Sequence, residues 1–349
     1  MAFDLQKLIR QNIKTLKPYS SARHEFTGEA SVFLDANENA YGSPLPENFN
    51  RYPDPLQWQL KMELSKIKGV PPENMVIGNG SDEIIDLAYR IFCTPGKDNV
   101  ILCPPTYGMY EVSANINDVE IKKVPLTPNF QLDVTNVLEA VDENTKLIFI
   151  CCPNNPTGDS VQRNEVEFLL NNFDGIVIID EAYINFSKQK SFIQELTEYP
   201  NLIVMQTLSK AWGLAALRIG LCFSSANIVS LYNNVKPPYN INEASQQLAI
   251  EALQNTSLVN NWIKEVVSER ENLVKGLTQL SFVKKIYPSD ANFILVKVED
   301  ADKVYSYLTE NKIIVRNRSK EILCDNCLRI TIGTPIENKN LLETLNNFQ

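Results

Sequence analysis

Short runs of apolar residues alternate with amphipathic stretches between about residues 75 and 225. The runs are nearly continuous, which is typical of strands buried on both faces of a parallel sheet. Between them, apolar positions recur every three or four residues, as at Ile84, Leu87 and Ile91, which predicts helices. This alternation predicts an α/β fold with a doubly wound, largely parallel sheet flanked by helices. Strands are expected at 75–77, 100–103, 119–124, 146–152, 175–179 and 202–205.

A different pattern begins near residue 242. One face of a long expected helix carries Trp262, Val266 and Leu273 at amphipathic spacing. We expect this part to form a small α+β domain, with a short strand at Phe33–Leu34 sharing its sheet. The remaining expected elements are strands at 292–296, 313–315 and 328–332 and a helix at 304–308.

Three parts are therefore expected in the chain. Residues 47–261 form the large α/β domain, and residues 31–46 join residues 262–349 in the small α+β domain. Residues 1–30 hold one short helix and an irregular segment, which we interpret as an N-terminal arm. An arm of this size cannot bury its own apolar side chains, so it must dock on the main body or on another subunit.

Composition narrows the class of protein. The chain has 349 residues, with 44% apolar and 21% charged residues, which is typical of a soluble globular protein. A net charge of −9 argues against nucleic-acid binding, because few phosphates could be neutralised. No apolar run approaches the roughly 18–20 residues of a membrane helix. The segment Met1–Lys7 is charged where a signal peptide would be apolar, so we expect a cytoplasmic protein.

Cysteine and histidine content excludes several catalytic systems. The seven cysteines lie mostly in apolar runs, where reduced, buried thiols are expected. Cys324 and Cys327 form a lone C-x-x-C pair, and His24 is the single histidine, so no metal site is expected. A catalytic triad would have to use His24, which has no nucleophile motif nearby. Lysine, tyrosine or carboxylate groups are the better candidates for proton transfer.

Polar side chains follow the expected strands. Ser81, Tyr107, Asn155, Asp180 and Lys210 each come shortly after an apolar run. Because right-handed crossovers bring the carboxyl ends of parallel strands to one edge, these residues should meet at a single crevice.

Two of these positions allow alternative interpretations. The turn Gly78–Glu83 could present backbone N–H groups to a phosphate at a helix N-terminus. It could also be an ordinary turn in which Ser81 or Asp82 caps the helix. Lys210 could be a partly desolvated amine nucleophile or a solvated surface lysine.

Taken together, these side chains fit pyridoxal phosphate better than a nucleotide. A nucleotide would not explain a buried carboxylate that faces an amine nucleophile. The aldehyde of pyridoxal phosphate would form a Schiff base with Lys210, while Asp180 would keep the ring nitrogen protonated. The phosphate would occupy the helix end at Ser81, helped by Ser209 and Arg218. Donors to the phenolic oxygen of the ring would be Tyr183 and Asn155.

Motifs in chain order resemble fold-type-I pyridoxal-phosphate aminotransferases. They are Gly80–Glu83, Pro105–Tyr107, Asn155–Gly158, Asp180–Tyr183 and Ser209–Lys210 with Arg218. Within this family, four segments are similar to histidinol-phosphate aminotransferases: Leu34–Asn39, Arg51–Pro53, Pro104–Tyr110 and Cys327–Thr334. The match covers nearly the whole chain, so it implies the fold of this family and a homodimer.

The resemblance also implies roles for individual residues. Lys210 would move the proton during transamination, Tyr107 would stack on the cofactor ring, and Arg329 would bind the α-carboxylate of glutamate. Tyr19 and Arg316 would bind the phosphate of histidinol phosphate. Residues implied around the cofactor phosphate are Gly80, Ser81, Asp82, Ser209 and Arg218, with Tyr52 from the other subunit. The implied substrate-binding residues are Tyr19, Asn37, Asn155, Arg316 and Arg329.

The resemblance implies transamination between L-histidinol phosphate and 2-oxoglutarate. Two other activities share the fold, those of an aromatic amino-acid aminotransferase and a threonine-phosphate decarboxylase. A non-catalytic binding or regulatory protein is the alternative outside enzymes. The sequence departs from the family pattern at Gln206, where arginine is frequent, and at Ala40, where proline is common.

Overall fold

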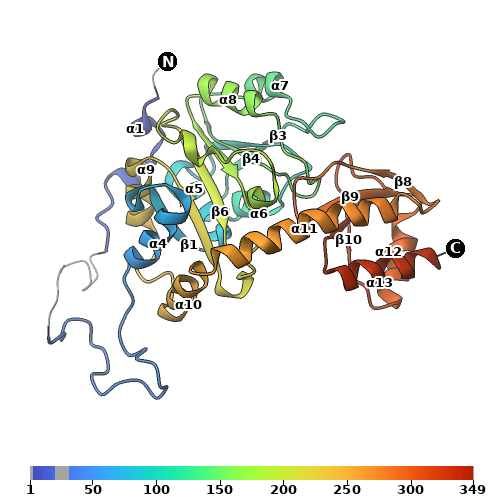
Figure 1. Cartoon of the computed structure of the whole chain (residues 1–349). Helices are drawn as coiled ribbons and strands as arrows, with labels where there is room; N and C mark the ends of the chain where they lie inside the picture. Colours follow the sequence, from blue (N-terminus) through green and yellow to red (C-terminus); the bar gives the residue numbers. More distant parts are fainter. Residues whose placement is uncertain (1–2, 20–30, 349) are drawn as a thin grey trace.

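The computed structural model describes residues 3–19 and 31–348, which form a large and a small sheet with their helices (Figure 1). The large sheet has seven strands in the order β1-β7-β6-β5-β4-β2-β3. These are β1 (Met75–Asn79), β2 (Asn99–Leu102), β3 (Glu120–Lys123), β4 (Thr145–Cys151), β5 (Ile176–Asp180), β6 (Leu202–Thr207) and β7 (Ile219–Phe223). Strands β2 to β6 run parallel, whereas β7 is antiparallel to both β6 and β1.

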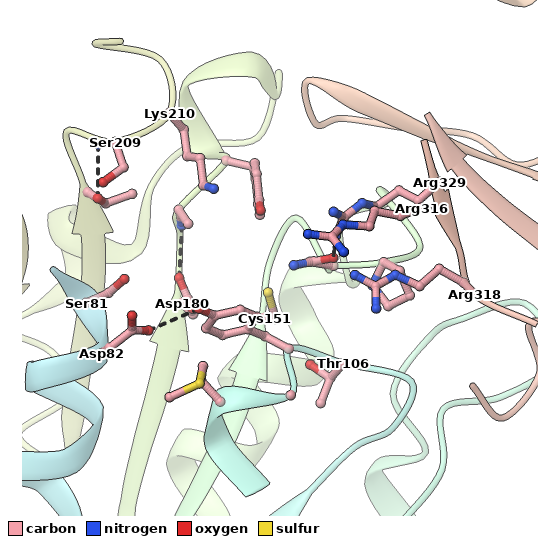
Figure 2. Close-up of a pocket in the computed structure, with 18 of the residues that line it drawn as sticks. Ser81, Asp82, Thr106, Cys151, Asp180, Ser209, Lys210, Arg316, Arg318 and Arg329 are labelled. Atoms are coloured by element: carbon pink, nitrogen blue, oxygen red, sulfur yellow. Dashed lines mark hydrogen bonds between the residues drawn. The ribbon is translucent and has the colours of Figure 1, made fainter. Parts of the chain in front are cut away.

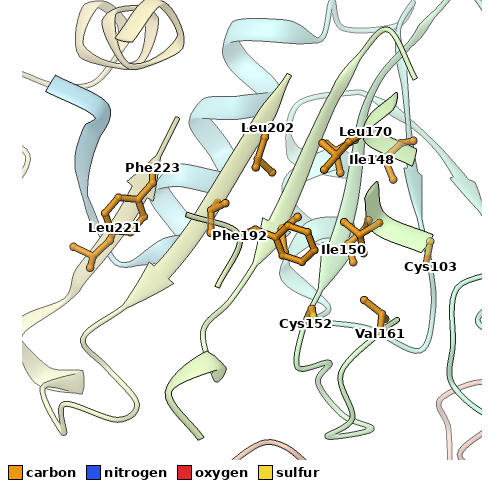
Figure 3. Close-up of a cluster of buried hydrophobic side chains, with 14 of the residues drawn as sticks. Cys103, Ile148, Ile150, Cys152, Val161, Leu170, Phe192, Leu202, Leu221 and Phe223 are labelled. Carbon is orange, nitrogen blue, oxygen red and sulfur yellow. The ribbon is translucent and has the colours of Figure 1, made fainter. Parts of the chain in front are cut away.

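Continuous apolar strands result from burial on both sheet faces. In β4, Leu147 and Phe149 pack in one hydrophobic cluster, and the alternate residues Ile148 and Ile150 pack in the other (Figure 3). Side chains of a strand alternate between faces, so a strand between two cores needs apolar residues at every position. Buried residues of α5 (Ser81–Phe92), α6 (Met109–Ile116) and α9 (Ala226–Val235) belong to the first cluster. Those of α4 (Trp58–Lys68), α7 (Val134–Glu139), α8 (Arg163–Asn172) and α10 (Glu243–Leu253) belong to the second.

The small sheet lies at the C-terminal end of the long helix α11 (Thr256–Leu277), as Figure 1 shows. Its strand order is β10-β11-β9-β8, and all its pairs are antiparallel. The strands are β8 (Val283–Ile286), β9 (Phe293–Val298), β10 (Arg316–Asn317) and β11 (Cys327–Thr331). A separate core joins this sheet to α12 (Ala301–Glu310), α13 (Pro335–Asn346) and the end of α11.

Short elements complete the chain. They are α1 (Leu5–Leu8), α2 (Gln11–Lys14) and the 3-10 turns η1 (Pro72–Asn74), η2 (Ile184–Phe186), η3 (Phe192–Glu195) and η4 (Ala215–Leu217). Within residues 3–19 and 31–348, no helix is long and apolar enough to cross a membrane.

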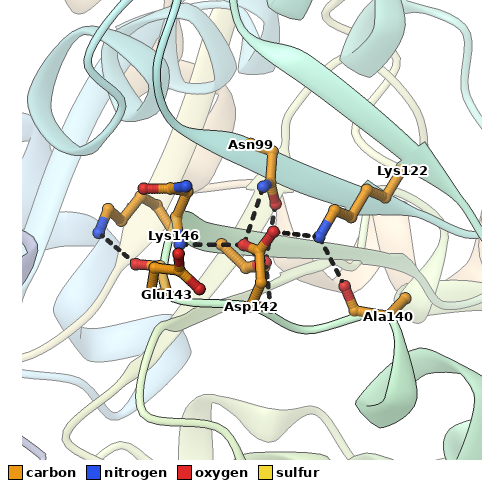
Figure 4. A network of polar contacts seen from close by, with 8 residues as sticks. Asn99, Lys122, Ala140, Asp142, Glu143 and Lys146 are labelled. Atoms are coloured by element: carbon orange, nitrogen blue, oxygen red, sulfur yellow. Dashed lines mark hydrogen bonds and ion pairs between the residues drawn. The ribbon is translucent and has the colours of Figure 1, made fainter.

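A polar network ties the amino ends of the parallel strands together (Figure 4). Asp142, just before β4, accepts hydrogen bonds from Lys122 Nζ of β3 at 2.6 Å and from Asn99 Nδ2 of β2 at 2.9 Å. These donors, Lys122 foremost, hold the pKa of Asp142 well below its usual range. Functional residues are expected at the carboxyl ends of these strands. The network therefore holds the opposite end of the sheet in place.

The predicted fold class is confirmed, with one strand unforeseen. The apolar pattern predicts no strand at Ile219–Phe223, where the structure has β7. The chain between β6 and β7 contains only the short turn η4 and no crossover helix, so β7 returns antiparallel.

Three local predictions are wrong. The expected strand at Phe33–Leu34 does not form, and neither residue belongs to a strand of either sheet. The strand expected at 313–315 is absent, and β10 begins one residue later, at Arg316. Ile313 and Val315 pack in the small core but form no strand pair. The single N-terminal helix is split into α1 and α2 at Arg10, whose ψ is 142° and whose N–H donates to Ile91 O.

Candidate active site

A cavity of about 440 Å³ lies where the carboxyl ends of β4, β5 and β6 face the small sheet. Side chains from both sheets point into it (Figure 2). The predicted site residues that line it are Ser81, Asp82, Tyr107, Asn155, Asp180, Tyr183, Ser209, Lys210, Arg218, Arg316 and Arg329. Most of them follow strands, so the parallel topology brings together residues that are far apart in the sequence.

Lys210 lies three residues past the end of β6, and its amine points into the cavity (Figure 2). Its Nζ is 5.5 Å from the centre of the Tyr183 ring. Although the side chain is open to the cavity, loss of hydration around the amine lowers its pKa, and the charge of Arg329 lowers it further. Asp180 opposes this shift. A lowered pKa increases the fraction of neutral amine, which is the nucleophilic form.

Asp180 ends β5 and is buried, with 3% of its surface exposed. Its Oδ2 accepts a hydrogen bond from Tyr110 Oη at 2.7 Å, and its Oδ1 accepts one from Ala182 N at 3.0 Å. Burial raises the pKa of Asp180, while these donors and the charge of Lys210 counteract the rise. Such a carboxylate gains strongly from a cationic partner.

Tyr110 is a residue of this site that the sequence interpretation missed. It is fully buried on α6 and stacks on Phe149 of β4, with ring centroids 4.9 Å apart. The available signal was the segment Pro104–Tyr110, which carries part of the resemblance and ends at this residue. The rings of Tyr107 and Tyr110 meet edge to face at 5.5 Å.

The amino end of α5 is open to the cavity. Its N-cap is Gly80, with a φ of 76°, and no side chain caps the helix, so the alternative in which Ser81 or Asp82 caps it is wrong. Asp82 instead accepts a hydrogen bond from Tyr107 Oη at 3.0 Å and lies 3.6 Å from Arg218 Nη2. An uncapped helix end beside a guanidinium is a favourable place for a phosphate.

Close backbone packing holds Arg218 at this helix end. Gly80 N donates to Arg218 O at 2.8 Å, and Arg218 has a left-handed backbone with a φ of 56°. A Cβ on Gly80 would lie 2.3 Å from Arg218 Nη2, and one on Gly220 would lie 2.3 Å from the carbonyl carbon of Gly80. Gly220 is therefore needed for the backbone contact between β7 and α5, while Gly80 leaves room for the Arg218 guanidinium.

Arg329 and Asn155 join the two sheets across the cavity. Arg329 Nη1 donates to Asn155 Oδ1, and the guanidinium carbon lies 5.2 Å from the centre of the Phe293 ring. Burial lowers the pKa of Arg329, and so do the charges of Arg318 and Arg316. In the small sheet, Arg316 pairs directly with Arg329. The cavity thus contains cationic groups able to hold an anionic ligand.

Four predicted residues do not line this cavity within one chain: Gly80, which is the N-cap of α5, and Asn37, Tyr52 and Tyr19. Tyr52 stacks on Tyr239 with ring centroids 4.5 Å apart and, with Asn37, lines a separate cavity. Tyr19 is 75% exposed and lines another cavity beside Trp58.

Gln206 occupies the position where the family pattern often has arginine. Its Oε1 accepts a hydrogen bond from Lys68 Nζ at 2.6 Å, and its Nε2 donates to Glu181 Oε2 at 2.8 Å. Lys68 therefore supplies a cation on the far side of the amide. Gln206 thus connects the end of α4 to the residue that follows β5.

The donor set of the cavity fits pyridoxal phosphate. The open end of α5 with Arg218 suits its phosphate, the buried Asp180 suits a protonated ring nitrogen, and Lys210 suits its aldehyde. The seven cysteines are all buried and free. Within residues 3–19 and 31–348, no cluster of three or more cysteine, histidine or acidic side chains could hold a metal ion.

Comparisons with known proteins bear on the family and the fold of the chain. The family model described as aminotransferase class I and II matches residues 34–345. A histidinol-phosphate aminotransferase from Cytophaga hutchinsonii is 54% identical over 348 residues, with all of both chains covered. The crystal structure of the histidinol-phosphate aminotransferase from Clostridium acetobutylicum is 25% identical, with a TM-score of 0.79 over 85% of this chain and 90% of that one. The enzyme from Sinorhizobium meliloti, solved in complex with pyridoxal-5'-phosphate, has the same fold, with 22% identity and a TM-score of 0.79 over 90% of both chains.

Proposed function

The chain belongs to the aminotransferase class I and II family, and on this premise we propose that it interconverts L-histidinol phosphate and 2-oxoglutarate with imidazole acetol phosphate and L-glutamate. This membership confirms the resemblance that the motifs indicated. The observation that carries the proposal is the cavity itself, in which Lys210 and Asp180 face arginines of the small sheet. An enzyme that alternates between a phosphate ester and a dicarboxylate needs such cations beside its reactive amine.

The cofactor of this family is pyridoxal phosphate. When bound, it supplies an aldehyde for amines and a ring that withdraws electrons from the carbon undergoing reaction. We assign its phosphate to the α5 end with Ser81, Ser209 and Arg218, and its ring to the space beside Tyr107. Asp180 would hold the proton on the ring nitrogen. The neighbouring ring oxygen would receive hydrogen bonds from Tyr183 and Asn155.

Lys210 would serve as the base that moves the substrate proton. Its lowered pKa favours the neutral amine, which can accept a proton from the carbon that bears the substrate amino group. The nearby Tyr183 ring and the partial desolvation of the amine limit its contact with water. Arg329 would bind the α-carboxylate of glutamate, and Arg316 the anionic group at the other end of the substrate.

A homodimer would complete the site. Tyr52, Tyr19 and Asn37 lie outside the cavity of their own chain, which supports a role in the site of a second copy. We propose that Tyr52 reaches the cofactor phosphate of the partner, and that the arm, residues 1–30, docks there as well. The proposed parts remain residues 47–261 for the large domain and residues 31–46 with 262–349 for the small one. The proposed location is the cytoplasm.

Three experiments address the alternatives. Faster turnover of phenylalanine than of histidinol phosphate would indicate an aromatic amino-acid aminotransferase. Release of carbon dioxide from threonine phosphate would indicate a decarboxylase. A purified protein that takes up no pyridoxal phosphate and shows no activity would indicate a non-catalytic role.

The central test compares Lys210→Ala with the unaltered chain. The cofactor absorbance of the unaltered protein should change on addition of histidinol phosphate, and the variant should lose turnover by about a thousandfold or more. Lys188→Ala, which removes an exposed lysine outside the cavity, is the control. A Lys210→Ala protein with the spectrum and turnover of the unaltered chain would refute the assignment.

A further inference from the structure

A third arginine of the small sheet reaches the cavity beside the two that have assigned roles (Figure 2). Arg318 follows β10 directly. Its backbone N–H donates to Cys327 O at 2.8 Å, which continues the pairing with β11. Residues two apart in extended chain share a face. Arg316 and Arg318 therefore present two guanidinium groups to the same side of the cavity.

Arg318 has a weakly held partner. Its Nη1 lies 3.5 Å from Glu321 Oε1, both side chains are partly exposed, and Glu321 also lines the cavity. The Nε of Arg318 is buried and has no hydrogen-bond partner. A partly exposed pair with a single long contact contributes little stability. Glu321 is thus a counter-ion that a better anion can replace.

Positive charge exceeds negative charge at this end of the cavity. Within residues 3–19 and 31–348, Arg316 and Arg329 have no ion-pair partner, and Glu321 is the single carboxylate paired with the three arginines. The ligand that completes this end must therefore be anionic. A phosphate dianion can bridge two guanidinium groups, whereas one carboxylate needs a single guanidinium.

We propose that the Arg318–Glu321 ion pair separates when a phosphate ester binds and stays formed when a dicarboxylate binds. One cavity can then accept substrates whose distal anionic group, the one at the end away from the reacting amino group, differs in charge. This inference rests on the proposed function, in which both kinds of substrate alternate. With the phosphate ester bound, its dianion displaces Glu321 and contacts Arg316 and Arg318. With glutamate or 2-oxoglutarate bound, the distal carboxylate contacts Arg316, and Glu321 remains on Arg318.

The experiment measures each half-reaction of the holoenzyme separately through the cofactor absorbance. Arg318→Gln should lower kcat/KM for histidinol phosphate by about 10- to 100-fold, because a charged contact made to the substrate is lost. The same variant should change kcat/KM for glutamate by less than about threefold, because Glu321 satisfies Arg318 in that complex. Lys320→Gln removes an exposed charge from the same segment outside the cavity and is the control.

Inorganic phosphate provides a probe that does not depend on the proposed substrate. As a competitor of glutamate, it should bind Glu321→Gln about threefold more tightly and Arg318→Gln at least about tenfold more weakly than the unaltered protein. An unaltered protein that uses glutamate but not histidinol phosphate would refute the proposed substrate, and the phosphate competition would still decide the role of Arg318. Equal losses for both substrates in Arg318→Gln, or phosphate inhibition unchanged in both variants, would overturn the inference.

Discussion

Tyr110 Oη donates a hydrogen bond of 2.7 Å to Asp180 Oδ2, which connects α6 to the end of β5. The donor favours the charged form of a carboxylate whose pKa burial raises. Tyr110 is thus a positioning residue for the carboxylate that we assign to the cofactor ring nitrogen.

Tyr110→Phe should raise the pKa of Asp180 further, because it removes the donor and keeps the burial. The acidic limb of the kcat profile should move to higher pH, and kcat should fall about tenfold or more. The pH dependence of the cofactor absorbance measures the same change without turnover. Tyr232→Phe, which removes a buried hydroxyl outside the cavity, is the control. A pH profile that moves equally in both variants would contradict a specific role for Tyr110.

Gly220→Ala should weaken cofactor binding. The added Cβ would lie 2.3 Å from the carbonyl carbon of Gly80 and 2.4 Å from Ser81 N, so β7 and the end of α5 would have to separate. We expect a loss of stability of about 1–3 kcal/mol and a cofactor affinity at least about tenfold lower, measured by equilibrium titration of the apoprotein.

Gly213→Ala is the matched control for this variant. Gly213 has a φ of 67° with no atom within 4 Å of an added Cβ, so alanine introduces backbone strain of about 1 kcal/mol but no clash. If both variants bind the cofactor equally well, the close packing at Gly220 does not shape the phosphate site.

The residues that sequence reasoning located correctly share one property: their positions follow from local pattern and parallel topology. Asp180 and Lys210 each follow an apolar run, and the rule that such strands end at one edge places them together. Tyr110 belongs to a different case, since its partner lies 70 positions away and no periodicity relates a helix face to a strand end. Lys68 and Gln206 are 138 positions apart, so their hydrogen bond could not be predicted from local pattern either.

Charged residues on irregular segments were the hardest to assign from sequence. Arg318 and a solvated surface arginine have the same local pattern, and only the pairing of β10 with β11 turns Arg318 toward the cavity. In the proposed homodimer, the environment of Tyr52 and Tyr19 would depend on a second chain, which neither their sequence context nor a single subunit reveals. The direction of β7 likewise depends on the missing crossover helix, which the apolar pattern does not reveal.

Lys61 offers a test of how buried charge affects stability. It lies on α4 with 2% of its surface exposed, and burial, followed by the charge of Lys236, lowers its pKa to about 8. In the unfolded chain the amine has its ordinary pKa of about 10.5. Below pH 8 both states are protonated and folding bears the full cost of the buried charge. Between pH 8 and about 10.5 the folded state loses its proton first, so stability rises through that range.

Lys61→Met should therefore be more stable than the unaltered chain at pH 7, by up to about 3 kcal/mol. The advantage should shrink between pH 8 and 10.5, because the buried amine of the unaltered chain loses its charge there and no longer destabilises the fold. Urea denaturation at pH 7 and at pH 10 measures the difference in the free energy of unfolding. Lys66→Met, an exposed lysine on the same helix, should show neither effect. An advantage that stays constant with pH would rule out the buried charge as its cause.

Gln206 orients its amide between opposite charges, with its oxygen toward Lys68 and its nitrogen toward Glu181. Glu181 is 1% exposed and also accepts a hydrogen bond from Phe192 N at 2.7 Å. Gln206→Arg would pair with Glu181 but would place a second cation beside Lys68. We expect this variant to lose about 1–3 kcal/mol of stability, although it restores the residue frequent in the family.

Lys68→Met alone should also be less stable, because it leaves Gln206 Oε1 without its donor. The double variant, Lys68→Met with Gln206→Arg, removes the repulsion and keeps a cation beside Glu181, so it should recover most of the stability lost in Gln206→Arg. Urea denaturation of the two single variants and the double variant gives the interaction energy, which should be favourable by about 1–3 kcal/mol. Additive losses would mean that Lys68 and Gln206 act independently.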